Sequence, residues 1–140
     1  MNDTGRVLLA KVKSAIQKAY APYSGFKVAC GLLFKGGFMV VGVNVENNSS
    51  QFTICAERAA LVKAVSEGLV PKTPLEAVII YEPSEPPIPP CAGCCQFLAE
   101  FAGPLLNISV LTPTNQRDYI LNDLLPFPYK RRQKHETGVL

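Results

Sequence analysis

Three cysteines at the starts of two predicted helices constrain the fold of this chain more than any other feature. Cys55 begins the run CAERAALVKAVSEG, and Cys91 and Cys94 lie in the first turn of CAGCCQFLAEF. Because Cys91 and Cys94 are three residues apart in a helix, their side chains share a face and can bind one tetrahedral ion. Together with Cys55 they predict a metal site formed where two helices begin.

The number of thiols favours a catalytic metal over a structural one. A structural zinc site would need a fourth ligand, yet of the five cysteines Cys30 lies within the apolar run VACGLLF and is expected to fill the core. Cys95 is four residues from Cys91, so spacing alone makes it a rival of Cys94. Three thiolates leave one position open, where the pKa of a bound water can fall to about 7.

Two charged residues beside Cys55 are candidates for roles in such a site, although an acidic residue such as Glu57 is also common at a helix N-terminus with no further role. Glu57 lies in the same first helical turn, close enough to bond a water at the metal and to carry protons. Arg58 is three residues after Cys55 on the same face and is our candidate for balancing the negative charge of three thiolates. Both helix N-termini favour the thiolate forms. The sole histidine, His135, lies in the basic C-terminal tail.

The composition indicates one compact intracellular domain. The chain has 140 residues, of which 48% are hydrophobic and 18% charged, with a formal net charge of +3. This charge is too small for a surface built to bind nucleic acid. No apolar run reaches the roughly 18 residues of a membrane span, and the N-terminus lacks a signal-peptide pattern. We expect a soluble, cytoplasmic protein with reduced cysteines and no membrane partner.

The order of predicted elements favours an α/β sandwich, a mixed sheet with helices packed on it. Residues 83–90 contain five of the twelve prolines and are predicted to form a stiff, ordered loop. Residues 1–128 are expected to form a single domain, and 129–140 an unstructured basic tail. The elements, in chain order, are a helix at 4–20, a hairpin of strands at 26–34 and 38–46, a helix at 55–67, a strand at 75–82, a helix at 91–101, a strand at 107–112 and a short helix at 118–125.

Several segments resemble the small cytidine deaminases of nucleoside salvage, a zinc-deaminase class with a three-cysteine variant. The matches follow one another in the family's order: YAPYSGFKV, VGVNVENNS, TICAERAALVKAVSEG, PPCAGC, QFLAEF and LLP. The resemblance implies a three-layer α-β-α sandwich with a mixed five-stranded sheet, a homotetramer, and zinc-dependent deamination of cytidine and deoxycytidine to uridine and deoxyuridine in pyrimidine salvage.

The resemblance also implies roles for individual residues. By family spacing it assigns zinc to Cys55, Cys91 and Cys94, which decides between Cys94 and Cys95. It assigns proton transfer to Glu57, the glutamate of the CAE triplet. The family's substrate-binding positions correspond to an aromatic beside the pyrimidine, two polar residues at the ribose hydroxyls and the alanine of the CAE triplet: Phe26, Asn44, Glu46 and Ala56.

The chain departs from the family at three places. Cys95 stands where the family usually has an arginine after the second cysteine of its PCxxC motif. Ser50, in NNSSQ, replaces an aromatic that commonly reaches a neighbouring subunit's site. After LLP the family has an aromatic that is here Phe127 or Tyr129. These changes preserve the chemistry and leave the identity of the substrate open.

Two alternatives therefore remain at this point. One is a deaminase of the same fold that acts on a different amino-pyrimidine, such as a modified nucleoside or a nucleoside antibiotic. The other is a non-catalytic zinc module with the tail segment KRRQKH as its contact surface, although short terminal charge runs are mostly solvated tails. Glu57 argues against the second, since a structural zinc needs no carboxylate beside an open position.

Overall fold

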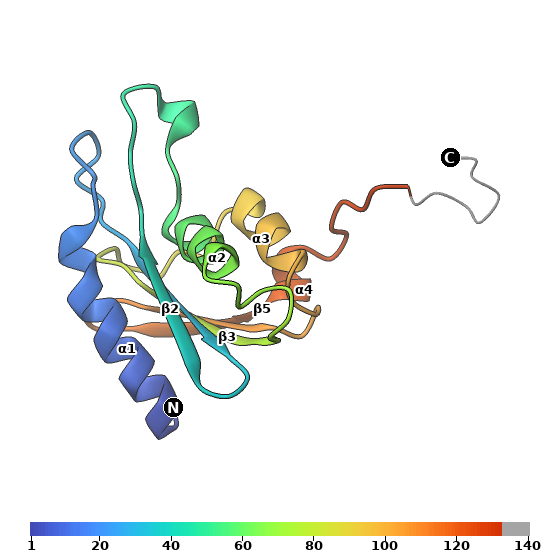
Figure 1. The fold of residues 1–140 in the computed structure, drawn as a ribbon. Coiled ribbons are helices and arrows are strands. Elements are labelled where there is room, and N and C mark those ends of the chain that lie inside the picture. Colours follow the sequence, from blue (N-terminus) through green and yellow to red (C-terminus); the bar gives the residue numbers. More distant parts are fainter. Residues whose placement is uncertain (133–140) are drawn as a thin grey trace.

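A mixed sheet of five strands forms the middle layer of the computed structural model, which describes residues 1–132 (Figure 1). The strand order is β2-β1-β3-β4-β5, and only β3 and β4 run parallel. This confirms the expected mixed five-stranded α/β fold. The strands are β1 (Ala29–Phe34), β2 (Phe38–Val43), β3 (Leu75–Tyr81), β4 (Asn107–Leu111) and β5 (Gln116–Ile120).

Helices cover both faces of the sheet. On one face α1 packs on β1, β2 and β3, and its buried residues Leu8 and Val12 contact Ala29 and Ile79. On the other face α2 and α3 lie side by side over a larger core. This core includes Leu61 of α2, Leu98 of α3 and buried side chains from every second position of the strands. The helices are α1 (Asp3–Ala15), α2 (Ala56–Ser66), α3 (Ala92–Ala99) and α4 (Leu121–Leu124), with 3₁₀ turns at Ile16–Lys18 and Ser50–Phe52.

The directions of the first three strands decide where α2 and α3 begin. β1 lies between β2 and β3 and is antiparallel to both, so β2 and β3 point the same way. The chain leaves the carboxyl end of β2 towards α2 and the carboxyl end of β3 towards α3. Because both helices follow strands of one direction and cover one face, their N-termini lie at the same edge of the sheet (Figure 1).

One predicted helix is in part a strand. The run 118–125 was expected to be helical, but Asp118, Tyr119 and Ile120 belong to β5, and only Leu121–Leu124 is a helix. The strand forms because Asp118 pairs with Ser109 of β4 and accepts its hydroxyl at 2.6 Å, while Tyr119 packs against the core under α3. Pairing with a distant strand overrides local helical spacing here.

The tail predicted for 129–140 starts with an ordered contact. Tyr129 donates its backbone N–H to Gln96 Oε1 at 2.8 Å, and the Gln96 amide donates to the carbonyl of Tyr129 at 3.0 Å. Residues 129–132 form neither helix nor strand. The rest of the predicted tail, with His135, lies outside the described residues. Within 1–132, no helix has the length and apolar character that crossing a membrane requires.

Gly42 allows α2 to lie directly on β2. A Cβ at this position would overlap the backbone nitrogen of Ala60 and would lie 2.8 Å from its Cα and 3.0 Å from the carbonyl oxygen of Ala56. These are backbone atoms of α2, so no side-chain rotation can relieve the overlap. The absence of a side chain at Gly42 therefore sets the height of α2 above the sheet.

We expect Gly42→Ala to lower the free energy of unfolding by about 2–3 kcal/mol, as overpacking against backbone does. Urea denaturation monitored by circular dichroism measures this loss. Gly103→Ala is the matched control, because a Cβ at Gly103 would have no atom within 4 Å and this glycine does not have a positive φ. Equal unfolding midpoints for the two variants would contradict the close approach of α2.

Candidate metal and substrate site

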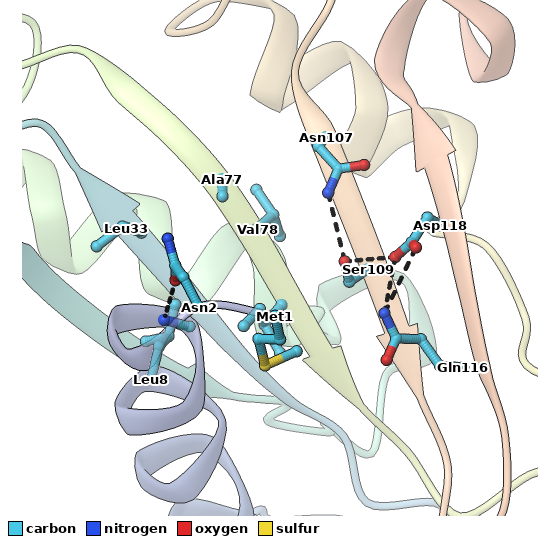
Figure 2. Close-up of a pocket in the computed structure, with 12 residues that line it drawn as sticks. Met1, Asn2, Leu8, Leu33, Ala77, Val78, Asn107, Ser109, Gln116 and Asp118 are labelled. Carbon is cyan, nitrogen blue, oxygen red and sulfur yellow. Dashed lines mark hydrogen bonds between the residues drawn. The ribbon is translucent and has the colours of Figure 1, made fainter.

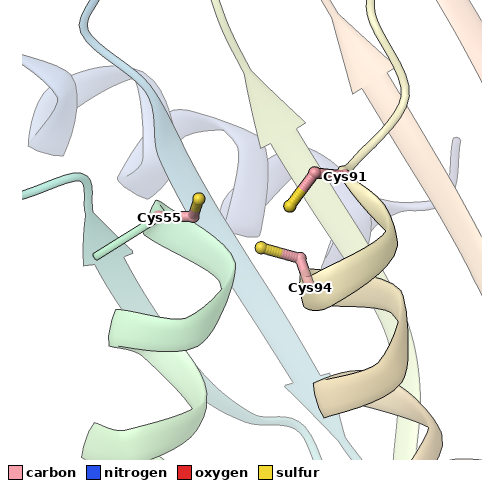
Figure 3. Close-up of side chains that lie close together, drawn as sticks. All are labelled: Cys55, Cys91 and Cys94. Atoms are coloured by element: carbon pink, nitrogen blue, oxygen red, sulfur yellow. The ribbon is translucent and has the colours of Figure 1, made fainter. Parts of the chain in front are cut away.

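Three thiols meet where α2 and α3 begin. Cys55 is the residue before α2, Cys91 is the residue before α3, and Cys94 lies in the first turn of α3. Their sulfur atoms all lie within 4.8 Å of one another, and Figure 3 shows the three side chains pointing to a common centre. The structure thus brings together the three cysteines that the sequence predicted as ligands.

Local backbone geometry turns the first two thiols away from their own helices. Cys55 and Cys91 have extended backbones, with φ and ψ of −68° and 154° and of −65° and 160°. Their carbonyls accept the first helical hydrogen bonds, from Ala59 and Cys95 at 3.0 Å, but neither thiol caps its helix. The side chains are therefore free to face each other, in the positive field of two helix N-termini.

The donor set fits zinc. Zn–S bonds of about 2.3 Å require thiolates that surround one point, and three sulfurs this close can do so with small side-chain movements. Arg58 supports the charge: its Nη2 donates to Cys55 Sγ at 3.6 Å and to the Thr53 carbonyl at 3.3 Å. Hydrogen bonding to Cys94, followed by the Arg58 guanidinium, lowers the pKa of Cys55 to about 5. A thiolate at Cys55 is the form that binds metal.

The neighbouring Cys95 points elsewhere. Its side chain is 1% exposed and belongs to the apolar core under α2 and α3, and its thiol donates to the Pro90 carbonyl at 3.7 Å. Burial raises its pKa to about 11, which favours the neutral thiol. Cys30 lies fully buried in the same core. The geometry therefore groups Cys94, and not Cys95, with Cys55 and Cys91.

Glu57 is a buried carboxylate next to the thiols. Its side chain is 6% exposed and lines a cavity of about 200 Å³ that Cys55 and Cys91 also line. Burial, with a smaller contribution from the negative charges of Cys55 and Glu82, raises its pKa to about 6. A carboxyl group with a pKa this close to neutral can both accept and release a proton, which is the property a proton carrier needs.

Three parts of the chain that are far apart in sequence contribute walls to the cavity. The segment before β1 contributes Phe26, the start of α2 contributes Ala56 with Glu57, and the loop before α3 contributes Ile88. Phe26 is partly exposed and lies outside both hydrophobic cores, so the structure gives it a place in the cavity wall. Ala56 is fully buried at the first position of α2, where backbone N–H groups have no helical partner.

Asn44, a predicted ribose-binding residue, lies in this cavity and orders its wall. Its side-chain oxygen accepts the N–H of Val28 at 2.9 Å, and its amide donates to the carbonyl of Phe26 at 2.8 Å. These bonds fix the backbone on both sides of Lys27. The Asn44 side chain is 8% exposed, so the two hydrogen bonds satisfy a buried amide.

Glu46, the other predicted ribose residue, lines an adjoining cavity that shares Thr53 with the first. Its Oε1 accepts the backbone N–H groups of Tyr23 at 3.0 Å and Ser24 at 3.1 Å. Hydrogen bonds from Ser24, and then from Tyr23, lower the pKa of Glu46. Both backbone bonds go to one carboxylate oxygen, and Oε2 accepts from neither of them.

The sequence interpretation missed Glu82, which also lines the cavity. This residue ends the apolar run LEAVIIYE, and its side chain is 3% exposed. A signal was present, because a charged residue that ends a buried strand immediately before the loop to Cys91 lies at the same sheet edge as the metal site. In the proline-rich segment that follows Glu82, Ile88, Pro89 and Pro90 line the cavity.

A second cavity, of about 290 Å³, lies on the opposite face of the sheet beside α1 (Figure 2). Its polar side chains bind one another: the Asn107 amide donates to Ser109 Oγ at 3.4 Å, and Ser109 and Gln116 both donate to Asp118, at 2.6 and 3.1 Å. The three thiols and Glu57 line the first cavity or its edge, so the chemistry lies on the α2 and α3 face.

Comparisons with known proteins agree with this geometry. The family model of the cytidine and deoxycytidylate deaminase zinc-binding region matches residues 3–109. The chain is similar to a cytidine deaminase of Halalkalibacterium halodurans, 45% identical over 92 residues that cover 64% of this chain and 67% of that protein. A cytidine deaminase of Mycobacterium tuberculosis is 36% identical over 120 residues, which cover 86% and 85% of the two chains. The crystal structure of cytidine deaminase from Burkholderia pseudomallei superposes with a TM-score of 0.81 at 34% identity, covering 92% of this chain and all of that one.

Zinc content tests whether Cys94 or Cys95 is the third metal ligand. We expect the unaltered protein and Cys95→Ala to contain about one zinc per chain, because the Cys95 thiol faces Pro90 and the core. Cys94→Ala should lose most of its zinc, since only two thiols would remain. Metal analysis after dialysis against a weak chelator measures both. Zinc retained by Cys94→Ala and lost by Cys95→Ala would reverse the assignment.

Proposed function

The chain belongs to the family of cytidine and deoxycytidylate deaminases, and on this premise we propose which of its residues carry out the reaction. The enzyme deaminates cytidine hydrolytically, so that water replaces the amino group at C4 and the products are uridine and ammonia. One observation carries the proposal: three thiols that fit zinc lie within 4.8 Å of one another, and two of them, Cys55 and Cys91, line the cavity that also contains the buried carboxylate of Glu57.

Cys55, Cys91 and Cys94 would hold the zinc. When bound, zinc supplies the Lewis acid that lowers the pKa of water to about 7 and so provides a nucleophile at neutral pH. Arg58 beside Cys55 and the N-termini of α2 and α3 offset the negative charge of the thiolates. The chain's residues then have to place the pyrimidine and move two protons.

Glu57 moves both protons. It takes the first from the attacking water and delivers it to N3 of the pyrimidine while the oxygen adds to C4. It then takes the proton of the C4 hydroxyl and passes it to the amino group, which leaves as ammonia while the C4 carbonyl forms. A pKa of about 6 suits a group that must alternate between its two forms. Burial of Glu57 strengthens these interactions by excluding water.

Four further residues would bind the nucleoside. The N–H of Ala56 at the start of α2 can donate to the pyrimidine carbonyl, and the ring of Phe26 can pack against the base. Asn44 and Glu46 are the proposed partners of the ribose hydroxyls, with Oε2 of Glu46, which does not accept the two backbone N–H groups, as acceptor. We extend the substrates to deoxycytidine and the role to pyrimidine salvage. A cytoplasmic location is proposed because the three thiols must stay reduced.

Turnover of nucleosides by Glu57→Gln tests the mechanism. We expect the unaltered enzyme to release ammonia from cytidine and deoxycytidine, and Glu57→Gln to lose about 10²–10⁴-fold in kcat, because an amide cannot carry the protons. Its zinc content should not change. Measurements are the loss of cytidine absorbance and ammonia release. If the enzyme turns over only modified amino-pyrimidines, the proposed substrate is wrong. Activity retained by Glu57→Gln would refute the proposed role of Glu57.

We also propose a homotetramer. Apolar side chains are exposed along the arm of residues 44–54, which extends beyond the sheet in Figure 1, and on α2. Exposed apolar side chains that gather into one patch mark protein interfaces, and we propose that these side chains form such a patch. They are Val45, Phe52 and Ile54 on the arm and Val62 and Val65 on α2, each between 38% and 63% exposed.

Sedimentation tests the assembly. We expect a species of four times the 15.2 kDa of one chain for the unaltered protein, and smaller species for Phe52→Asp, because a buried charge would oppose association. Leu105→Asp is the control, since Leu105 is 80% exposed and lies outside both groups. A monomer at micromolar concentration would contradict the tetramer.

A further inference from the structure

We propose that Glu82 is a positioning residue for the deamination: its buried carboxylate holds Ile88 in the wall of the substrate cavity. The inference rests on the proposed function for its link to catalysis. The segment involved is residues 83–90, here called the proline loop, which connects β3 to Cys91. Glu82, Ile88, Pro89 and Pro90 all line the cavity that contains Glu57.

Glu82 makes one hydrogen bond through its side chain. Its Oε1 accepts the backbone N–H of Ile88 at 2.7 Å. Its own N–H donates to the Leu111 carbonyl at 3.0 Å, which extends the parallel pairing of β3 and β4 by one residue and fixes where the carboxylate starts. The Glu82 side chain, at the end of β3, therefore reaches across the loop and binds the backbone of Ile88 near the other end of the loop.

This bond has no backbone substitute within the loop. Five of the eight residues are prolines, which lack an N–H, so only Ser84, Glu85 and Ile88 can donate. Over the last five residues, 86–90, Ile88 carries the only backbone N–H. Those five residues lead directly to Cys91. Glu82 thus binds the one main-chain donor in the part of the loop that borders the metal site.

A different carboxylate anchors the outer part of the loop. Glu85 accepts hydrogen bonds from Thr112, from Thr114 at 2.6 Å and from Asn115 at 2.7 Å, all in the turn between β4 and β5. These bonds lower the pKa of Glu85 to about 2. Glu85 is exposed and lies outside the cavity lining. The two acids divide the loop, with Glu85 holding the outer end and Glu82 the cavity end.

Two weaker contacts bind other carbonyls of the loop. Tyr119 donates its hydroxyl to the Pro87 carbonyl at 3.4 Å, and Cys95 donates its thiol to the Pro90 carbonyl at 3.7 Å. Neither contact involves the backbone N–H of Ile88. Ile88 is 55% exposed at the cavity rim, and within residues 1–132 the bond to Glu82 is the only hydrogen bond of its backbone N–H, so loss of Glu82 would leave this part of the loop unanchored. Substrate binding should suffer more than the metal site.

A positioning role requires the acceptor oxygen of Glu82. The negative charge strengthens the bond to Ile88 and also contributes to the raised pKa of Glu57. Hydrogen bonds to ionised acceptors are stronger than those to neutral ones, which explains a carboxylate at this place. Gln at position 82 keeps an acceptor oxygen of the same reach, and Ala removes it. A direct catalytic role for the charge would instead make Gln as harmful as Ala.

Hydrogen exchange at Ile88 tests the bond without relying on activity. Because 86–90 has a single backbone N–H, exchange measured over that segment reports on Ile88 alone. We expect exchange on the order of tenfold faster in Glu82→Ala and a few-fold faster in Glu82→Gln. Glu76→Ala is the matched control, since Glu76 is an exposed acid on the same strand. Unchanged exchange in both Glu82 variants would overturn the proposal, and the Gln variant decides it if the Ala variant does not fold.

Kinetics of the zinc-loaded protein test the consequence. We expect Glu82→Ala to raise KM for cytidine about three- to tenfold, with kcat and zinc content close to those of the unaltered enzyme, and Glu82→Gln to restore most of the KM. A fall in kcat shared by both variants would show that the charge of Glu82 acts on the substrate or on the pKa of Glu57, and would overturn a positioning role. Absence of turnover in the unaltered enzyme would refute the proposed function, while the exchange measurement would still decide the contact.

Discussion

The placement of β1 between β2 and β3 is the constraint on which the site depends. Since β1 is antiparallel to both neighbours, β2 and β3 share a direction, and the helices that follow them start at one edge of the sheet. Gly42 then lets α2 lie close to β2, and α2 and α3 pack against each other. Cys55 and the pair Cys91 and Cys94 converge because of strand order, although 36 residues separate Cys55 from Cys91.

The same geometry shifts the pKa values of two neighbouring acidic groups, Cys55 and Glu57, in opposite directions. Cys55 lies where a thiol partner, Arg58 and a helix N-terminus favour the anion, so its pKa falls. Glu57 lies two residues further along, inside the cavity, where burial favours the neutral acid and its pKa rises. One helix start thus supplies a thiolate suited to metal binding and the carboxylate that we propose as the proton carrier. Groups whose environments separate their pKa values in this way are typical of acid and base catalysis.

The sequence predicted those parts of the site whose positions depend on residues close together in the chain. The places of the three thiols, Glu57 and Arg58 follow from helix periodicity and the family motifs, and the structure brings them together. The strand at 118–120 was missed because pairing with Ser109, nine residues away, decides it. Glu82 was missed for a related reason: its role depends on the path of a loop that returns Ile88 to the end of β3, and no periodic pattern encodes that path.

Cys95 shows how the same fold accommodates a departure from the family. Its side chain is buried in the core under α2 and α3, where it fills space as a small hydrophobe. Zinc with three thiolates has a formal charge of −1. With Arg58 alone beside Cys55, the two helix N-termini must supply more of the compensation than they would with a second guanidinium. The geometry that gathers the thiols is therefore also the geometry that makes the missing arginine tolerable.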